Sequence, residues 1–116
     1  MKITTISFLK SGDSVYLSDK KRGFGTGYLN GYGGKMMEGE SVDGAAIREL
    51  REEAGLIASS ENLQKVAVID FFDGDEHIFE CHVFFVSKWE GELKESEEMA
   101  YPQLYMCANL PYEKMW

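Results

Sequence analysis

Residues Gly34–Leu56 read GKMMEGESVDGAAIRELREEAGL, and this stretch decides the fold of the chain. Glu40 follows Gly34 after five residues, and Arg48 follows Glu40 after seven more. From Arg48 the sequence runs RELREEAGL, which places three glutamates close together near the end of the stretch. This pattern of charged, apolar and glycine positions predicts a helix with one acidic edge.

The predicted helix runs from about Val42 to Ala54 and has a suitable residue at each end. Ser41 is a good N-cap, Asp43 suits the positive end of the helix dipole, and Gly55 suits a left-handed C-cap. At about 100° per residue, four apolar residues form one stripe that faces a core. They are Ala46, Ile47, Leu50 and Ala54.

The edge beside this stripe carries the charged residues. Glu49 and Glu53 lie one turn apart, with Glu52 next to them on the outer side, and Arg48 can pair with Glu52 four residues later. Clustered carboxylates repel one another unless a cation or an arginine offsets them. Mg²⁺ prefers oxygen ligands and is commonly held by a few carboxylates together with substrate phosphates. The alternative is an ordinary solvated, acidic surface helix.

The spacing G, five residues, E, seven residues, R-E-U-x-E-E-x-G-U, with U aliphatic, is that of the Nudix box. Seven positions of the box are fixed in identity, so a chance match at a given start has a probability on the order of 10⁻⁹ at average residue usage. The chain therefore resembles the Nudix hydrolases. The resemblance implies cleavage of a nucleoside diphosphate linked to another group, and an α/β fold in which a mixed β-sheet carries the box helix on one face.

Composition bounds the class of protein. The 116 residues suffice for one domain, residues 1–116, and 44% hydrophobic content fits a packed core. No apolar run is long enough to span a membrane, and no signal-peptide pattern begins the chain. Cys81 and Cys107 lack metal-site spacing, so we expect free thiols and a cytoplasmic setting. The net charge of −8 argues against binding a nucleic acid polymer.

Outside the helix, the chain reads mostly as strands. A glycine-rich loop with short extended pieces is predicted at Lys20–Lys35, and Glu90–Glu98 is predicted to be an acidic connection. Turn residues separate the members of two hairpins, at Lys10–Asp13 and Asp73–Asp75. The predicted strands are Lys2–Leu9, Ser14–Leu17, Leu63–Phe72, Glu76–Trp89 and Ala100–Met106.

The glycine-rich loop, KKRGFGTGYLNGYGGK, is the second informative region. Its glycines allow close approach to a ligand, and Lys20, Lys21, Arg22 and Lys35 form a basic cluster in an acidic chain. In a phosphate-processing enzyme these side chains would meet phosphates, whereas the alternative is a solvated basic loop. The wording of the loop resembles the MutT-type branch of the family, especially the oxidised purine nucleoside triphosphatases. HVF at 82–84, ESEEM at 95–99 and LPYEKMW at 110–116 also look like that group.

This resemblance implies a metal site and a reaction. Glu49, Glu52 and Glu53 match carboxylates that bind Mg²⁺ or Mn²⁺, with the Gly33 carbonyl and Glu98 as further ligands. Without the family, Glu98 would read as part of a solvated acidic loop. Glu52 or Glu53 would orient or deprotonate the attacking water. The resemblance also includes Arg48 in the catalytic set, where it orients the box by pairing with a glutamate.

The resemblance further implies a nucleotide-binding pocket. Asn30 matches a residue that hydrogen-bonds the purine base, Phe24 one that helps to wall the base pocket, and Trp116 one that stacks on the base. The other members contact the remainder of the substrate. Phe71 and Phe72 fall in a strand that contributes to this pocket. The predicted substrate-binding residues are Thr5, Lys20, Phe24, Asn30, Lys35 and Trp116.

Three functions compete at this point. The first is metal-dependent hydrolysis of a nucleoside triphosphate to the monophosphate and pyrophosphate, with oxidised purine nucleotides such as 8-oxo-dGTP as substrates. The second is a Nudix hydrolase of a dinucleotide polyphosphate or a nucleotide sugar. The third is a nucleotide-binding module without catalysis.

The related enzymes continue past the position of Trp116 with base-reading acids and a second long helix, which covers the sheet face opposite the box helix. From the sequence we therefore expect the C-terminal helix of the α/β/α sandwich to be missing. We also expect either a truncated chain or a homo-oligomer in which a partner copy covers the uncovered apolar face.

Overall fold

The structure is a computed structural model that describes residues 2–22 and 26–115. In these ranges the chain forms one α-helix, seven strands and three short 3₁₀ turns at Ser60–Asn62, Cys107–Asn109 and Tyr112–Lys114. The strands are β1 (Lys2–Ser11), β2 (Ser14–Asp19), β3 (Leu29–Asn30), β4 (Tyr32–Lys35), β5 (Leu63–Asp73), β6 (Glu76–Val86) and β7 (Gln103–Met106), and the helix is α1 (Val42–Ala54).

The strands form a mixed sheet in the order β3-β2-β1-β6-β5, which confirms the predicted fold class. β1 and β6 run parallel, and the other pairs are antiparallel. β1 exchanges partners along its length, because Thr4–Ser7 pair with β4 whereas Lys10 and Ser11 pair with β2. This exchange brings the glycine-rich β4 against the first half of β1, directly before the chain enters α1.

The helix begins and ends where the sequence predicts. The Ser41 hydroxyl accepts a hydrogen bond from the Gly44 N–H at 3.0 Å, and Gly55 has a φ of 69°, in the left-handed region. The buried face differs from the predicted stripe, because Ala45 is buried and Ile47 is only half-buried. Glu53 joins the buried face as well, since β4 lies against that edge of the helix and donates a backbone N–H to its carboxylate.

Several strand boundaries differ from the sequence prediction. β1 continues through Ser11, so the first turn shortens to Gly12 and Asp13. β6 ends at Val86 rather than at Trp89, because the Ser87 N–H bonds to the carbonyl of Asn62 instead of continuing the ladder. The last strand is limited to Gln103–Met106. These differences shift ends and leave the order of elements as predicted.

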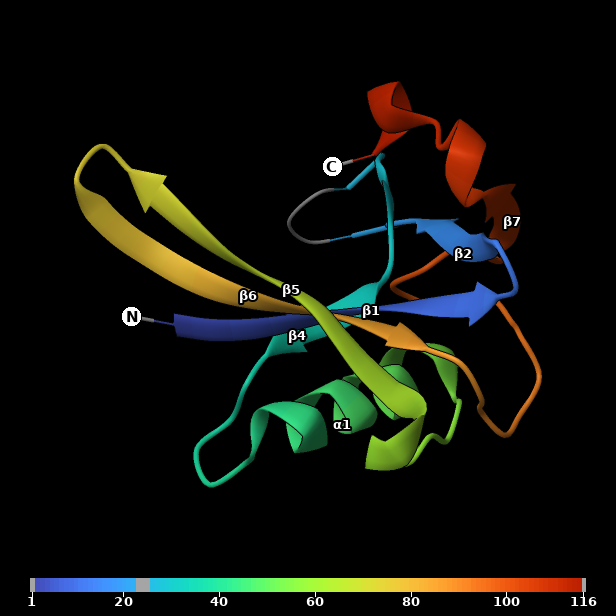
Figure 1. Cartoon of the computed structure of the whole chain (residues 1–116), viewed down its shortest axis with the longest axis horizontal. Coiled ribbons are helices and arrows are strands. Elements are labelled where there is room, and N and C mark those ends of the chain that lie inside the picture. Colours follow the sequence, from blue (N-terminus) through green and yellow to red (C-terminus); the bar gives the residue numbers. More distant parts are fainter. Residues whose placement is uncertain (1, 23–25, 116) are drawn as a thin grey trace.

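Two apolar clusters lie on opposite faces of the sheet. One packs α1 through Leu50 and Ala54 onto Leu9 and Val86. Figure 1 shows α1 on one side of the sheet and the C-terminal turns on the other. The second cluster lies on that other side and contains Val15, Leu17 and Leu29, with Phe8, Phe85 and Met115 packed against them.

Both cysteines are free thiols and are half-buried. Burial raises the pKa of the Cys81 thiol. No helix in the described part of the chain is long and apolar enough to cross a membrane.

Candidate active site

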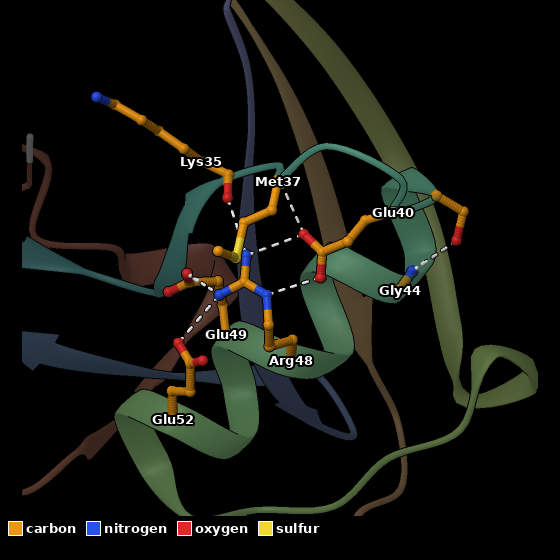
Figure 2. A network of polar contacts seen from close by, with 8 residues as sticks. Lys35, Met37, Glu40, Gly44, Arg48, Glu49 and Glu52 are labelled. Carbon is orange, nitrogen blue, oxygen red and sulfur yellow. Dashed lines mark hydrogen bonds and ion pairs between the residues drawn. The ribbon is translucent and has the colours of Figure 1, made fainter.

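Arg48 joins the charged residues of α1 to the loop that precedes the helix. Its Nε and Nη2 donate to the two carboxylate oxygens of Glu40 at 2.7 and 3.1 Å. Its Nη1 donates to Glu49 at 2.7 Å and to Glu52 at 3.0 Å, and Nη2 also reaches the carbonyl of Lys35 at 2.9 Å. Figure 2 shows the guanidinium at the centre of this network. The predicted pairing of Arg48 with a box glutamate is therefore present, and Arg48 is saturated as a donor.

The hydrogen bonds of this network also shift the pKa values of Glu40 and Arg48. Hydrogen bonds from Arg48, followed by one from the Met37 N–H at 2.7 Å, lower the pKa of the Glu40 carboxyl. The carboxylates of Glu40 and Glu49 raise the pKa of Arg48 further above its ordinary value. Glu40 and Arg48 thus remain charged over the whole range of pH in which the protein would work, and they orient Glu49 and Glu52.

Glu53 has a different environment from its two neighbours on the helix edge. It is 7% exposed, and its Oε1 accepts a hydrogen bond from the Gly33 N–H at 2.8 Å. Burial is the largest cause that raises the pKa of Glu53, to about 8, and the negative charges of Glu49 and Glu98 raise it further. The Gly33 hydrogen bond and the charge of Lys20 oppose this shift. Glu53 is therefore a buried carboxyl poised near neutral pH.

The two glycines of β4 are required by close packing at this point. A Cβ on Gly33 would lie 1.8 Å from the carbonyl oxygen of Thr5, and one on Gly34 would lie 2.7 Å from the Glu49 carboxyl carbon. Any side chain here would separate β4 from β1 or displace Glu49. The glycine pair thus allows the backbone and the helix carboxylates to meet, whereas the predicted close approach of these glycines to a ligand stays a prediction.

Glu98 reaches the site from the acidic connection after β6. Its side chain is 43% exposed and pairs with Arg22 at 3.5 Å. Its charge is close enough to Glu53 to raise the pKa of that carboxyl. Glu98 thus influences Glu53 through its charge, although it lies far from α1 in the sequence, and its carboxylate is paired with Arg22.

The oxygen donors of this site suit a hard divalent cation, because a buried carboxyl with carboxylate neighbours is stabilised in its charged form by a nearby positive ion. In residues 2–22 and 26–115, however, no three His, Cys, Asp or Glu side chains gather closely enough to hold an ion. Each carboxylate satisfies a local donor instead: Glu49 and Glu52 bond to Arg48, Glu53 to Gly33 and Glu98 to Arg22. The ligand set stays a prediction.

A cavity of about 620 Å³ lies over the sheet on the face opposite α1. Its floor is made by alternate residues of three neighbouring strands, since Thr4 pairs with Cys81 and Cys81 pairs with Ile69. Phe71 stacks on Phe79, with ring centroids 4.4 Å apart, at one end of this floor. The cavity is mostly apolar with a few polar groups at its rim, which is the usual character of a small-molecule site.

Four of the predicted substrate residues line the cavity: Thr5, Lys20, Asn30 and Lys35. The Asn30 side-chain oxygen accepts a hydrogen bond from the Gly31 N–H at 2.9 Å. The Thr5 hydroxyl is buried and has no hydrogen-bond partner among the described residues. Phe24 and Trp116, the two predicted aromatic contacts, lie outside the described residues.

The sequence prediction of the pocket missed several lining residues. Of the two phenylalanines that it placed near the pocket, Phe71 lines the cavity and Phe72 is 60% exposed. Met115 and Phe79 line the cavity and were not predicted. Phe79 could have been found from the alternation along β6, which puts it on the same face as Cys81. Met115 could not be found in this way, because it follows the 3₁₀ turn Tyr112–Lys114 and lies outside the strands.

Comparison with known proteins gives matches over most of the chain. The family described as NUDIX domain matches residues 4–107. A protein of Danio rerio called oxidized purine nucleoside triphosphate hydrolase is 40% identical over 116 residues, covering 99% of this chain and 72% of the relative. The protein of the same name from Mus musculus is 40% identical over the same shares of the two chains.

Solved structures agree in fold. A MutT NUDIX hydrolase from Burkholderia pseudomallei superposes with a TM-score of 0.80 at 23% identity, covering 95% of this chain and 86% of that one. A MutT protein from Bacillus halodurans superposes with a TM-score of 0.71 at 27% identity, covering 91% of this chain and 69% of that one.

Proposed function

The chain belongs to the Nudix hydrolases, in their MutT-like branch, and we propose that it hydrolyses a purine nucleoside triphosphate to the monophosphate and pyrophosphate. The observation that carries this proposal is the position of Glu53. It is a buried carboxyl with a pKa of about 8, hydrogen-bonded to Gly33. Gly33 also lines the cavity, together with Lys20 and Lys35.

The proposed reaction needs a divalent cation, and the site offers hard oxygen donors for one. Glu49, Glu52, Glu53, Glu98 and the Gly33 carbonyl would hold it. When bound, Mg²⁺ or Mn²⁺ would offset the negative charge of the phosphates and lower the pKa of a bound water.

The roles of the protein groups follow from their contacts. A carboxylate of α1 takes a proton from the water that attacks the α-phosphorus in line. The bond between that phosphorus and the oxygen bridging to the β-phosphate breaks, and pyrophosphate leaves. Glu52 and Glu53 are the two candidates for this base. Glu53 is favoured, because Glu52 is 54% exposed and bonded to Arg48, whereas Glu53 is buried and bonded only to the Gly33 N–H among the contacts described above. Arg48 orients Glu49 and Glu52, and Lys20 and Lys35 meet the phosphates.

For the substrate, we propose an oxidised purine nucleotide such as 8-oxo-dGTP, which would make the protein a sanitiser of the nucleotide pool that protects DNA. The names of the animal relatives support this class. An apolar cavity of about 620 Å³ has room for a purine, and Asn30 supplies an amide that can read its polar edge. By the resemblance, Phe24 would help to wall the base pocket and Trp116 would stack on the base.

The test is pyrophosphate release from a panel of substrates, with and without Mg²⁺ or Mn²⁺. The panel contains 8-oxo-dGTP, dGTP, dATP, a dinucleotide polyphosphate and a nucleotide sugar. We expect release from the triphosphates only with metal, and the highest kcat/KM for the oxidised purine. Glu53→Gln should lower kcat by about 10³-fold or more, because it removes the base and keeps the acceptor for Gly33.

Glu92→Gln is the matched control for this variant, because it removes an exposed carboxylate and should leave kcat unchanged. Nucleotide binding without pyrophosphate release from any substrate would overturn the enzymatic proposal in favour of a binding module. Preference for the dinucleotide or the sugar would keep the chemistry and reject the substrate.

As the alternative to a nucleotide on the apolar face opposite α1, we propose a homo-oligomer in which a second copy covers that face. Ile69 and Ile78, which line the cavity, are 45% and 37% exposed, and a partner copy would bury them. Light scattering at micromolar concentration tests this proposal, and a monomer at every concentration would reject it. The cytoplasm remains the proposed compartment, in keeping with the two free thiols.

A further inference from the structure

β5 forms one end of the sheet, and its outer edge has no partner strand among the described residues. It is 11 residues long, whereas β3, at the other end of the sheet order, has 2 residues. All residues of β5 except Leu63 and Phe71 are exposed. Figure 1 shows the β5–β6 hairpin reaching beyond the rest of the sheet. A long free edge presents backbone N–H and C=O groups that can pair with another strand.

The middle of this edge is apolar on both faces of the sheet. Val68 is 46% exposed and Ile69 is 45% exposed. Because side chains alternate along a strand, Val68 faces the α1 side and Ile69 lines the cavity. β5 contains no proline, and its only charged residues are Lys65, Asp70 and Asp73. The features that usually keep an edge from pairing are therefore sparse at its centre.

A bulge at Val66 puts Lys65 and Asp70 on the same face of the sheet. Lys65 and Ala67 pair with two consecutive residues of β6, so Val66 is an extra residue in the strand. Without this residue, the odd spacing of Lys65 and Asp70 would put their side chains on opposite faces. Both therefore face the α1 side, where the Lys65 ammonium lies 5.7 Å from the centre of the Phe84 ring.

The two charges are poorly balanced within one copy of the chain. Lys65 forms no ion pair among the described residues. Asp70 lies directly across from Glu80 in the β5–β6 ladder, and like charges in that position repel. One oxygen of the Asp70 carboxylate bonds to His77 at 3.0 Å, but the side chain is still 48% exposed. A cation beside Asp70 would offset this repulsion.

We propose that two copies of the chain pair antiparallel through their β5 edges, about a twofold axis at Val68. An axis perpendicular to the sheet keeps each side chain on its own face and brings the same residues together in both copies. Val68 then lies opposite the partner's Val68. Because Val66 is an extra residue in each strand, Asp70 lies opposite the partner's Lys65 on the α1 side.

This register is self-complementary. The pair of Asp70 with the partner's Lys65 occurs twice by symmetry, and opposite charges at directly opposed positions stabilise a sheet. On the cavity face, Ile69 meets the partner's Ala67, so apolar groups meet there. The pairing leaves the cavity open to a nucleotide, unlike a dimer in which a second copy covers that face. It requires neither catalysis nor a bound metal.

Sedimentation velocity of the full chain at micromolar concentrations measures the dimer. We expect Val68→Lys to raise the dimer Kd by about 10-fold or more, because two ammonium groups then meet at the axis. Ile57→Lys is the matched control, since Ile57 is 57% exposed and lies outside the named strands, and it should leave the Kd unchanged. Urea denaturation of both variants checks that they are folded.

Val68→Cys tests the register. Opposite residues of an antiparallel pair have Cα atoms about 4.5–5.5 Å apart, a separation that a disulfide spans. On oxidation, Val68→Cys should form a disulfide-linked dimer above any background from Cys81 and Cys107, which wild type also contains. Phe72→Cys, exposed on the same strand, should stay unlinked, because Phe72 lies opposite the partner's Leu63 rather than opposite itself.

Exchange of the two charges tests the ion pair, and it decides the matter even if Val68→Lys unfolds. Lys65→Asp and Asp70→Lys should each raise the dimer Kd by about 3- to 10-fold. The double variant should return the Kd to within about twofold of wild type, because the pair is restored with its signs reversed. Loss of the His77 bond in Asp70→Lys could not be repaired by a change at Lys65, so rescue reports on the pair alone.

A monomer at every concentration, a dimer that Val68→Lys leaves intact, or no rescue in the double variant would overturn the inference. A dimer that Ile78→Lys dissociates and Val68→Lys does not would assign the interface to the cavity face instead, since Ile78 lines the cavity. Pyrophosphate release tests the proposed function separately, because the dimer forms without substrate.

Discussion

The two faces of the central sheet differ in how far their charged side chains are paired within the chain. On the α1 face, Arg48 bonds to three carboxylates and one carbonyl, and Glu53 takes the Gly33 N–H. On the cavity face, the ammonium groups of Lys20 and Lys35 form no ion pair within the described residues, although acids outnumber bases in the chain. The α1 face is organised by the chain itself, whereas the cavity face presents free cations to a ligand.

This difference suggests that the α1 face serves the chemical step and that the cavity face serves the choice of substrate. Groups that are fixed before substrate arrives need no reorganisation during the reaction, which favours catalysis on the α1 side. Unpaired lysines above an apolar floor favour an anion with a flat apolar part, such as a nucleotide. Variants on the α1 face should therefore change kcat and stability, and variants on the cavity face should change KM.

The largest expected effect concerns Glu53 and pH in the presence of a chelator. The folded pKa of Glu53, about 8, lies above its ordinary value of 4.5. The stability given by the protonated carboxyl is therefore complete below about pH 4.5 and is lost as pH rises through about 8. Wild type should lose up to about 1.4 kcal/mol per pH unit in this window relative to Glu53→Gln, or about 5 kcal/mol in all.

Urea denaturation of both proteins at pH 5, 7 and 9 measures this difference. Glu53→Gln should match wild type at pH 5 and exceed it at pH 9. A constant difference at all three values would show that burial does not govern this carboxyl.

The next effect concerns the hub of the α1 face. Arg48→Met leaves Glu40 and Glu49 without their main donor, and Arg48 itself is only 15% exposed. We expect a loss of about 2–3 kcal/mol in the free energy of unfolding, since charge-assisted bonds at half-buried sites are lost together. Arg51→Met, in the same helix but exposed, should change stability by less than about 0.5 kcal/mol. Similar losses in both variants would show that the Arg48 network contributes little to the free energy of unfolding.

A smaller effect is expected on the cavity face. Asn30→Ala should raise KM for purine triphosphates by about 10-fold, because one polar contact to the base is lost, while kcat stays within about threefold of wild type. Steady-state kinetics measures both constants, with the exposed Asn109→Ala as the control. A fall in kcat with unchanged KM would move Asn30 from selection to chemistry.

The smallest effect concerns Thr5, whose buried hydroxyl has no partner among the described residues. Thr5→Val keeps the shape and removes the unsatisfied group, so stability should rise by up to about 1 kcal/mol. Thermal denaturation measures the change. A marked loss of stability would mean that the hydroxyl is bonded in solution.

Much of the fold and part of the site could be predicted from residues close together in the chain. The bounds of α1 agree because caps are local, with Ser41 bonding Gly44 three residues away. The pair of Arg48 with Glu52 follows from one turn of helix. The predicted buried face of α1 is partly wrong, because Ile47 is only half-buried. The helical period of the sequence does not show which edge of the helix a strand will cover.

The sequence by itself determined the helix, its carboxylate edge, the glycine-rich approach and the family, because each depends on spacing within a short stretch. The tertiary structure alone decided which glutamate is buried, which face of the sheet holds the cavity and which strand forms its long free edge. Those outcomes depend on strands that pair across the chain. Gly33 reaches Glu53 only because β4 pairs with β1 and packs against α1, and burial at that junction, rather than residue type, distinguishes Glu53 from Glu52.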